Sequence, residues 1–379
     1  MPIDEIISRE FPIDEEIVYL NHAAVSPWPL RTANAVKTFA EENTRFGAQN
    51  YLSWIETETR LRGQLQRLIN APSLNDIALL KNTSEALSVV ASGLKWQSGE
   101  NIVSSNEEFP SNRLPWLAQA KHGVEFREIE IAGVDSPEQA LIEACDEKTR
   151  LITISSVQYG SGRCVDLMQI GEFCSTNNIL FCVDAIQSLG ALPFDVQSIK
   201  ADFVMADAHK WMLGPEGIAV FYCKSDIRDL LELHQFGWHM IKDAGNYAAK
   251  EWQAADSAQR FECGSPNMLG IHAFSASLSL IEEVGIENIS KNIINNSSYI
   301  IDNIKNINGL EFISPTEKPH YAGIVTFNIE GKDMSEIYTK LMKNKVICAN
   351  RAGGIRFSPH FYSSQNKIDK GLEVLALII

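Results

Sequence analysis

Short apolar runs alternate with amphipathic segments through the middle of this 379-residue chain. The apolar runs have the length of buried β-strands, whereas residues 85–94, which follow Asn82-Thr83-Ser84, have the pattern of a helix. Strands that alternate with helices indicate βαβ units and a mainly parallel sheet. We therefore expect an α/β fold with strands at residues 77–80, 101–104, 151–155, 180–183, 203–205 and 217–221.

The pattern changes after about residue 255, where long helical segments come first and isolated strands follow. We expect helices at residues 267–284, 290–307 and 367–376 and strands at 324–329 and 346–349. This indicates two units, a large domain over residues 17–255 and a smaller α+β domain over residues 256–379. The N-terminal arm, residues 1–16, could pack on either and is grouped with the smaller domain.

Charge and composition narrow the range of partners. A formal net charge of −15 argues against nucleic acid, which needs clustered Lys and Arg. No apolar run approaches the roughly 18 residues of a membrane span, and the acidic N-terminus lacks the apolar region of a signal peptide. The seven cysteines are scattered without a CxxC motif, which indicates a reducing compartment and no zinc site. We expect a cytoplasmic protein that binds neither membranes nor metal ions.

Two ionisable residues follow successive apolar runs. Asp184 ends one run and Lys210 follows the next, so both side chains are expected at the carboxyl edge of the sheet, where open parallel sheets bind ligands. A lysine amine can form an aldimine with the aldehyde of pyridoxal 5′-phosphate (PLP), while an aspartate keeps the pyridine nitrogen protonated. The alternative is an ion pair between two strand ends, which these two residues alone slightly favour.

The segment Asn82-Thr83-Ser84-Glu85 lies between a predicted strand and a predicted helix. Its hydroxyls and backbone N–H groups could bind an anion at the helix N-terminus. Ordinary capping explains the same residues. An anion site, a lysine and an aspartate at one sheet edge together favour a phosphate-bearing cofactor.

Seven motifs occur in one order along nearly the whole chain. They lie at residues 19–24, 82–85, 108–112, 183–187, 209–211, 261–267 and 356–362. With these motifs the sequence resembles the class V, fold-type I PLP enzymes, a family that includes cysteine desulfurases, kynureninases, isopenicillin-N-epimerase-like proteins and several aminotransferases. The resemblance implies a large domain with a mainly parallel seven-stranded sheet between helices, a smaller C-terminal α+β domain and a PLP cofactor.

The resemblance also implies roles for single residues around the cofactor. Lys210 would form the Schiff base, Asp184 would pair with the pyridine nitrogen, and Gln187 would hydrogen-bond the phenolic oxygen. Phe109 would stack on the ring where desulfurases place a histidine, which keeps the π-face and loses a titratable group. The phosphate would be held by Thr83, Ser84 and His209.

Further positions concern the substrate and a second subunit. Trp238 matches an aromatic residue that contacts the cofactor in kynureninases. Ser265 matches a residue that reaches the phosphate of the neighbouring subunit, which implies a homodimer with shared active sites. Arg356 matches the arginine that binds the substrate carboxylate. Arg351 is a second candidate with a structural role as its alternative, and His22 is a weaker one whose alternative is packing.

Several positions depart from the family pattern. Asp207 stands where desulfurases often have a serine near the phosphate, so we expect its carboxylate to point elsewhere, or the alignment to slip there. Ser156 or Gln158 occupies the region of a family asparagine near the ring oxygen, and the sequence does not choose between them. Cys348 lies in an apolar run, where a thiol is a poor nucleophile. The chain is therefore not expected to be a typical cysteine desulfurase.

These observations predict a PLP enzyme that acts on an amino acid through a Lys210 aldimine and a quinonoid intermediate. An aminotransferase is the first expectation. The alternatives are a PLP-dependent lyase of the cysteine desulfurase or kynureninase kind and an amino-acid epimerase. A PLP-fold protein that binds without turnover is a remote alternative, because fold alone does not prove catalysis.

Overall fold

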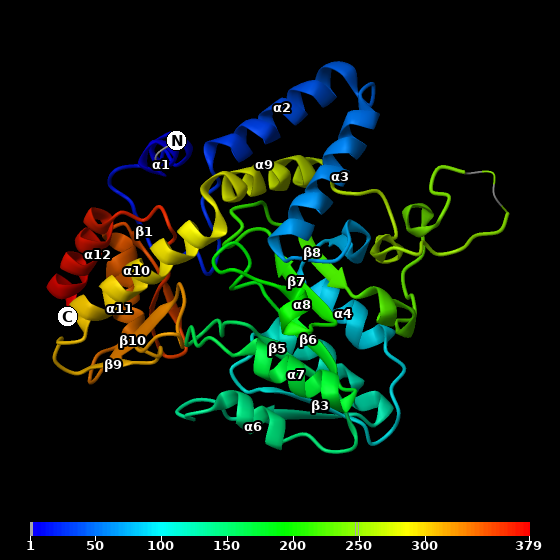
Figure 1. Ribbon diagram of the computed structural model, residues 1–379. Helices are drawn as coiled ribbons and strands as arrows, with labels where there is room; N and C mark the ends of the chain where they lie inside the picture. Colours follow the sequence, from blue (N-terminus) through cyan, green and yellow to red (C-terminus); the bar gives the residue numbers. More distant parts are fainter. Residues whose placement is uncertain (1–2, 247, 249) are drawn as a thin grey trace.

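A seven-stranded sheet forms the centre of the protein, described here by a computed structural model that covers residues 3–246, 248 and 250–379 (Figure 1). The strand order is β2-β8-β7-β6-β5-β3-β4. Strands β3 to β7 pair in parallel, and β8 runs antiparallel to both of its neighbours. The predicted mainly parallel seven-stranded sheet is confirmed. The strands are β2 (Ile77–Leu80), β3 (Asn101–Ser105), β4 (Glu125–Ile129), β5 (Thr149–Ser155), β6 (Leu180–Asp184), β7 (Phe203–Asp207) and β8 (Ala219–Cys223).

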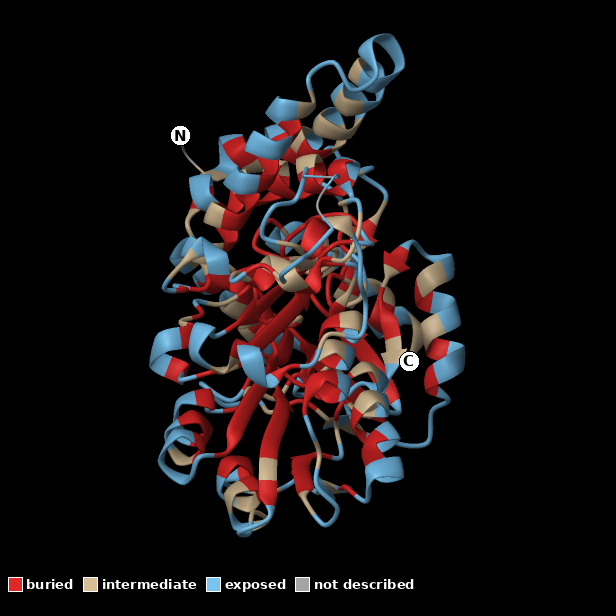
Figure 2. Ribbon diagram, turned by 90° about the vertical axis from the view of Figure 1, so that its right-hand side faces the viewer, coloured by how far each residue is buried: buried red, intermediate tan, exposed pale blue. Residues whose placement is uncertain are grey.

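The inner strands are buried along their length, as Figure 2 shows by the continuous red of the sheet. Parallel strands covered on both faces contain near-continuous apolar runs, which is why these segments stand out in the sequence. Ser155 pairs with Asp184, and Asp184 pairs with Met205, so β5, β6 and β7 end at one edge. Polar side chains that end these strands therefore meet in space.

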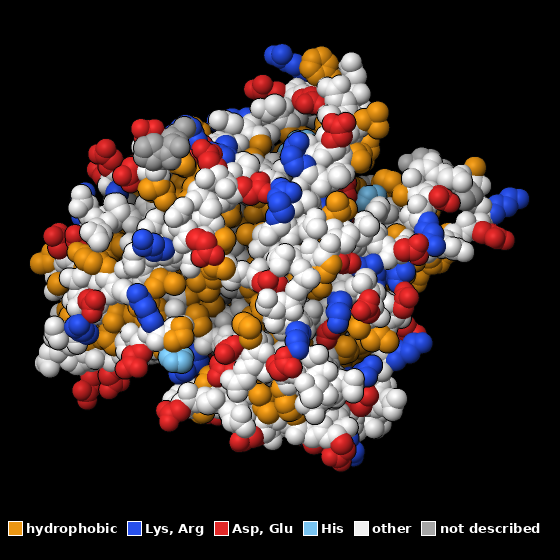
Figure 3. All heavy atoms as spheres, viewed as in Figure 1, with side chains coloured by type: hydrophobic (Ala, Val, Ile, Leu, Met, Phe, Trp, Pro, Cys, Tyr) orange, Lys and Arg blue, Asp and Glu red, His pale blue; other side chains and the backbone are white. Residues whose placement is uncertain are grey.

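Helices cover the sheet and extend beyond it. Helices α2 and α3 rise above the sheet, and both pack against α9 (Figure 1). On the face drawn in Figure 3, acidic and basic side chains are interspersed. No single helix in the described part of the chain is long and apolar enough to cross a membrane; α9 and α10 meet that test only together, with a bend of 83° between them. The bounds are α2 (Leu30–Phe46), α3 (Tyr51–Leu68), α4 (Thr83–Gly93), α5 (Leu114–Leu117), α6 (Pro137–Glu143), α7 (Leu167–Asn177), α8 (Val196–Ile199) and α9 (Met268–Val284).

The C-terminal part builds a four-stranded antiparallel sheet in the order β12-β13-β10-β9. The short strand β1 (Val18–Tyr19) pairs in parallel with β11. The domain boundary at residue 255 stays a prediction, since α9 packs on the helices of the N-terminal part and β1 pairs with a C-terminal strand. The elements are α10 (Ile286–Ile304), β9 (Leu310–Phe312), β10 (Val325–Ile329), α11 (Met334–Lys343), β11 (Val346–Ile347), β12 (Ala349–Arg351), β13 (Gly354–Phe357) and α12 (Gln365–Ile378).

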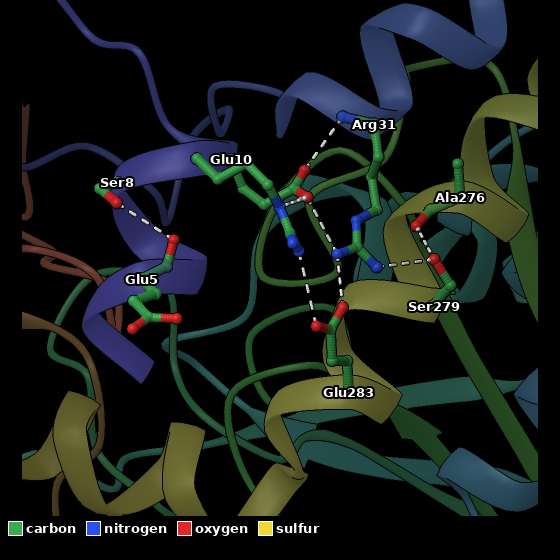
Figure 4. A network of polar contacts seen from close by, with 8 residues as sticks. Glu5, Ser8, Glu10, Arg31, Ala276, Ser279 and Glu283 are labelled. Carbon is green, nitrogen blue, oxygen red and sulfur yellow. Dashed lines mark hydrogen bonds and ion pairs between the residues drawn. The ribbon is translucent and has the colours of Figure 1, made fainter. Parts of the chain in front are cut away.

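The N-terminal arm, which carries helix α1 (Ile3–Glu10), contacts both parts of the molecule. Arg31 at the start of α2 holds it, with Nη2 lying 2.9 Å from Glu10 Oε1 and 2.5 Å from Oε2 of Glu283 on α9 (Figure 4). On the other side, Phe11 stacks on Tyr362 with ring centroids 3.6 Å apart. The arm therefore bridges the two predicted domains.

Candidate active site

A cavity of about 240 Å³ lies at the carboxyl ends of β5, β6 and β7. It brings together side chains from segments far apart in the sequence, as the strand order requires. Predicted site residues that line it are Thr83, Phe109, Asp184, Gln187, His209, Lys210, Arg351 and Arg356.

Lys210 and Asp184 face this cavity without forming a direct ion pair. Within the described residues, no carboxylate oxygen lies within 4.0 Å of Lys210 Nζ, which lies 5.9 Å from the centroid of the Phe109 ring. Burial lowers the pKa of Lys210 below the usual lysine range, the guanidinium of Arg356 adds to this, and Asp184 opposes it. The amine is therefore available as a nucleophile or base, and a simple strand-bridging salt bridge is not what the structure contains.

Asp184 ends β6 with its carboxylate buried. Its Oδ1 accepts a hydrogen bond from the N–H of Ile186 at 3.0 Å. Burial raises the pKa of Asp184, while that hydrogen bond and the charge of Lys210 oppose the rise. A buried carboxyl group with these opposing effects on its pKa is suited to pair with a cationic nitrogen on a ligand. Such a partner would offset the cost of removing the carboxylate from water.

Phe109 lies at the mouth of the cavity and meets Tyr159 edge to face, with centroids 5.1 Å apart and an interplanar angle of 77°. The preceding residue, Glu108, anchors this loop to the end of β5. Its buried carboxylate accepts hydrogen bonds from the N–H of Ser155 at 2.7 Å and from Asn112 Nδ2 at 2.8 Å. The sequence signal for this anchor was available in the motif Glu108-Phe109-Pro110, but only the aromatic residue was interpreted.

The two candidates for the position near the ring oxygen, Ser156 and Gln158, do not line the cavity, and the choice between them stays open. Gln158 Nε2 donates to Glu108 Oε1 at 2.8 Å, and the hydroxyl of Ser156 hydrogen-bonds that of Ser188 at 2.6 Å. Both side chains are thereby directed away from the cavity. Their neighbour Tyr159 lines it instead.

The phosphate side of the predicted site contains an unexpected acid. Asp207 lines the cavity, and its Oδ1 accepts a hydrogen bond from the N–H of Thr83 at 3.1 Å. Of the two expectations for this position, that the carboxylate points elsewhere or that the alignment slips there, the first does not match the place of Asp207 in the cavity at the N-terminus of α4. Ser84 is exposed and hydrogen-bonds Ser111 at 2.7 Å beside the cavity, without lining it.

Gln187 lines the cavity and is held by two neighbours. Its Nε2 donates to the carbonyl of Ala23 at 3.1 Å, and its Oε1 accepts from Trp211 Nε1 at 2.7 Å. One amide N–H remains available, which would suit an oxygen acceptor on a ligand.

Two arginines form the opposite end of the cavity. In the hairpin of β12 and β13, Ala349 pairs with Arg356 and Arg351 pairs with Gly354, so both arginines project from one face. Arg356 is 2% exposed, its Nη1 donates to the carbonyl of Tyr159 at 2.7 Å, and its Nε has no hydrogen-bond partner among the residues that the structure describes. Burial lowers the pKa of Arg356 to about 10, and the charge of Arg351 adds to the shift. A carboxylate bound here would offset both the burial of the Arg356 charge and its repulsion by Arg351.

Besides Ser84, three predicted residues lie outside the cavity. His22 is fully buried, and its two ring nitrogens lie 2.8 Å from the carbonyl of Ser358 and 2.7 Å from the hydroxyl of Tyr362. Both nitrogens are used in packing, which favours the packing alternative, and the substrate-binding role of His22 stays a prediction. Trp238 Nε1 donates to the hydroxyl of the exposed Ser265 at 3.4 Å, away from Lys210. The cofactor contacts expected for Trp238 and Ser265 stay predictions.

No cysteine lines the cavity in the described part of the chain. Cys348 is buried, and its burial raises the pKa of the thiol to about 12. Such a thiol remains protonated at neutral pH and is a poor nucleophile.

The chain is similar in sequence and in fold to known proteins. The model of the family described as aminotransferase class-V matches residues 18–370. A protein of Methanothermobacter thermautotrophicus named as a probable cysteine desulfurase is 30% identical, over 96% of this chain and 95% of that protein. Among solved structures, the cysteine desulfurase CsdA of Escherichia coli covers 100% of both chains with a TM-score of 0.88 at 20% identity. The cystine C-S lyase C-DES, in complex with its product cysteine persulfide, has a TM-score of 0.88 at 23% identity over 96% of this chain and 98% of that one. The two structural likenesses show the fold.

Proposed function

Because the chain belongs to the aminotransferase class-V family and is a PLP-dependent enzyme, we propose that it breaks the carbon–sulfur bond of a sulfur-containing amino acid. The observation that carries this proposal is the cavity in which Lys210 and the two arginines face a common space. An aminotransferase was the first expectation, and the names of similar proteins favour the lyase alternative instead.

The cavity residues fit PLP. Lys210 offers an amine that has no carboxylate partner among the described residues, Asp184 offers a buried carboxyl for the ring nitrogen, and Gln187 offers an amide N–H. Phe109 offers a face for the ring, while Thr83 and His209 line the phosphate side. When bound, PLP supplies an aldehyde that links to amines and a ring that accepts electrons.

The protein's own groups would then position and deprotonate the substrate. Arg356 binds the α-carboxylate through the edge of its guanidinium that has no partner, which fixes the orientation of the α-carbon. Lys210 takes the α-proton, because its lowered pKa makes the amine a base near neutral pH. Phe109 and Tyr159 cover the reacting groups on the open side.

The cysteines separate two kinds of carbon–sulfur cleavage. An enzyme that passes sulfur to its own thiol needs a reactive cysteine in the site, and none lines this cavity among the described residues. We therefore propose β-elimination, in which the α-proton is removed and the bond from Cβ to sulfur breaks. From cystine the products are pyruvate, ammonia and cysteine persulfide, with water consumed in hydrolysing the aminoacrylate.

This proposal is tested by incubating the PLP-loaded protein with cystine, cysteine and alanine. We expect pyruvate and persulfide from cystine, with the visible cofactor absorbance retained after turnover. Alanine as the organic product would indicate a desulfurase, and conversion of the cofactor to its amine form would indicate an aminotransferase; either result would overturn the lyase assignment. Lys210→Ala is the control that should abolish turnover.

Two further features belong to the same proposal. We propose a homodimer, because Ser265 is exposed and lies outside its own chain's Lys210 cavity. We also propose a cytoplasmic location without membrane or nucleic-acid partners, which is supported by seven free cysteines and a net charge of −15.

A further inference from the structure

Asp207 and Thr83 are joined by a pair of hydrogen bonds at the beginning of α4. Asp207 Oδ1 accepts from the N–H of Thr83 at 3.1 Å, and the N–H of Asp207 donates to Thr83 Oγ1 at 3.0 Å. Asn82 caps the same helix, with its side chain accepting from the N–H of Glu85 at 2.8 Å. The carboxylate of Asp207 thus lies at the positive end of α4 and takes a donor that an anionic ligand would use.

The other ionisable groups around this carboxylate do not neutralise it well. His209 Nδ1 lies 3.8 Å from Asp207 Oδ2, and burial, together with the charge of Lys210, lowers the pKa of that imidazole to about 4. His209 is therefore uncharged at neutral pH. Lys210 attracts the Asp207 carboxylate, whereas Glu216 and Asp184 repel it.

A cofactor phosphate at this place would meet a carboxylate of the same sign. Two anions in contact within a partly desolvated site repel each other strongly. A protonated carboxyl would remove the repulsion and would also donate its O–H to a phosphate oxygen, while its other oxygen kept the hydrogen bond from Thr83. Burial already raises the pKa of Asp207 to about 6, so the proton is accessible near neutral pH.

We propose that Asp207 competes with the cofactor phosphate for the N-terminus of α4, and that PLP binding is coupled to uptake of one solvent proton by this carboxyl group. The inference rests on PLP use by this site and is independent of which bond the enzyme breaks. With this coupling, the affinity for PLP falls as the pH rises above the pKa of the free Asp207 carboxyl group. A larger share of the protein molecules must then take up a proton when PLP binds.

The test compares PLP with pyridoxal, which has the same aldehyde and ring but no phosphate. The affinity of each is measured by absorbance titration of the cofactor-free protein at about pH 6.5 and about pH 8.5, both above the pKa of the free Asp207 carboxyl group, so that PLP binding requires proton uptake at both. Between the two pH values, we expect the PLP affinity of the wild-type protein to fall by a factor at least about ten times larger than the corresponding factor for Asp207→Asn. At the higher pH, Asp207→Asn should bind PLP at least about tenfold more tightly than wild type. Pyridoxal affinity should be nearly equal in the two proteins.

Asp202→Asn is the matched control, because Asp202 is a half-buried acid that directly precedes β7, at the opposite end of that strand from Asp207. It removes the same charge and should leave the preference for PLP over pyridoxal unchanged. Asp207→Ser provides a second variant, and thermal melting checks that each protein is folded. Equal pH dependence in wild type and Asp207→Asn, or weaker binding of PLP and pyridoxal alike in both Asp207 variants, would overturn the inference. A wild-type protein that takes up no PLP would instead refute the proposed function, together with this inference.

Discussion

At the scale of single residues, Arg356 has hydrogen-bond donors available for a ligand, because within the described part of the chain its buried guanidinium donates through Nη1 to Tyr159 and its Nε has no partner. Replacing it with lysine keeps the charge and removes the planar pair of donors. We expect Arg356→Lys to raise the KM for the amino acid by about tenfold to a hundredfold, since a hydrogen bond to a charged group contributes about 1.5–3 kcal/mol. Steady-state kinetics with cystine measures this change.

Arg351→Lys is the control for that substitution, because Arg351 projects from the same face but is exposed. It should change KM by less than about threefold, as expected for a solvated charge. If Arg351→Lys raised KM more than Arg356→Lys, the two arginines would have the opposite roles.

The residue types of the site were largely predictable, whereas the side-chain directions were not. Lys210, Asp184 and Arg356 follow or lie in strands with a strong apolar pattern, so the sheet carries them to the cavity. Tyr159 was missed because the choice between Ser156 and Gln158 depended on which side chain the buried carboxylate of Glu108 would attract. That competition is settled by contacts between residues about fifty positions apart, which no local pattern contains.

At the scale of secondary-structure elements, the loop after β3 depends on one buried acid. Glu108 accepts hydrogen bonds from the N–H and the hydroxyl of Ser155 and from the side chains of Asn112 and Gln158. Glu108→Gln replaces an acceptor with a donor that faces other donors. We expect the free energy of unfolding to fall by about 1–3 kcal/mol, as for buried polar groups left without partners. Denaturant unfolding measures it.

The same variant should also change the absorption of bound PLP, because Glu108 precedes Phe109 at the cavity. Glu107→Gln is the control: Glu107 is half-buried and hydrogen-bonds Ser161, so this change should cost less stability and leave the spectrum intact. Equal loss of stability in both variants would contradict the anchoring role of Glu108.

The bounds of the buried strands in the large sheet were predicted to within one or two residues, whereas the edge strand β4 was not predicted. Glu125, Arg127 and Glu128 interrupt its apolar pattern, because an edge strand is paired on one side only and exposes charged side chains. The predicted strand 346–349 is divided between β11 and β12, which pair with different partners. Pairing partners far away in the sequence decide such boundaries.

At the scale of the whole molecule, the proposed dimer predicts that Ser265 acts in the partner's site. We expect Ser265→Ala to weaken PLP binding while Lys210 stays intact in the same chain. Heterodimers that combine one Lys210→Ala chain with one Ser265→Ala chain should recover one tight PLP site per dimer, measured by absorbance titration after purification with two different tags. Recovery would be absent if Ser265 acted within its own chain or only structurally.

The pairing of β1 with β11 also bears on the order in which the protein is assembled. Val18 lies beside Val346, and His22 is held by Ser358 and Tyr362, so the first strand finds its partners only after residues 346–362 have been made. Contacts of such long sequence separation form late, because the entropy of closing the loop is paid before they stabilise anything. During synthesis on the ribosome, the sheet that carries Asp184 and Lys210 can form before Arg356 has emerged. The cofactor half of the cavity would thus precede the substrate half, and a newly made chain could capture PLP before it is able to turn over an amino acid.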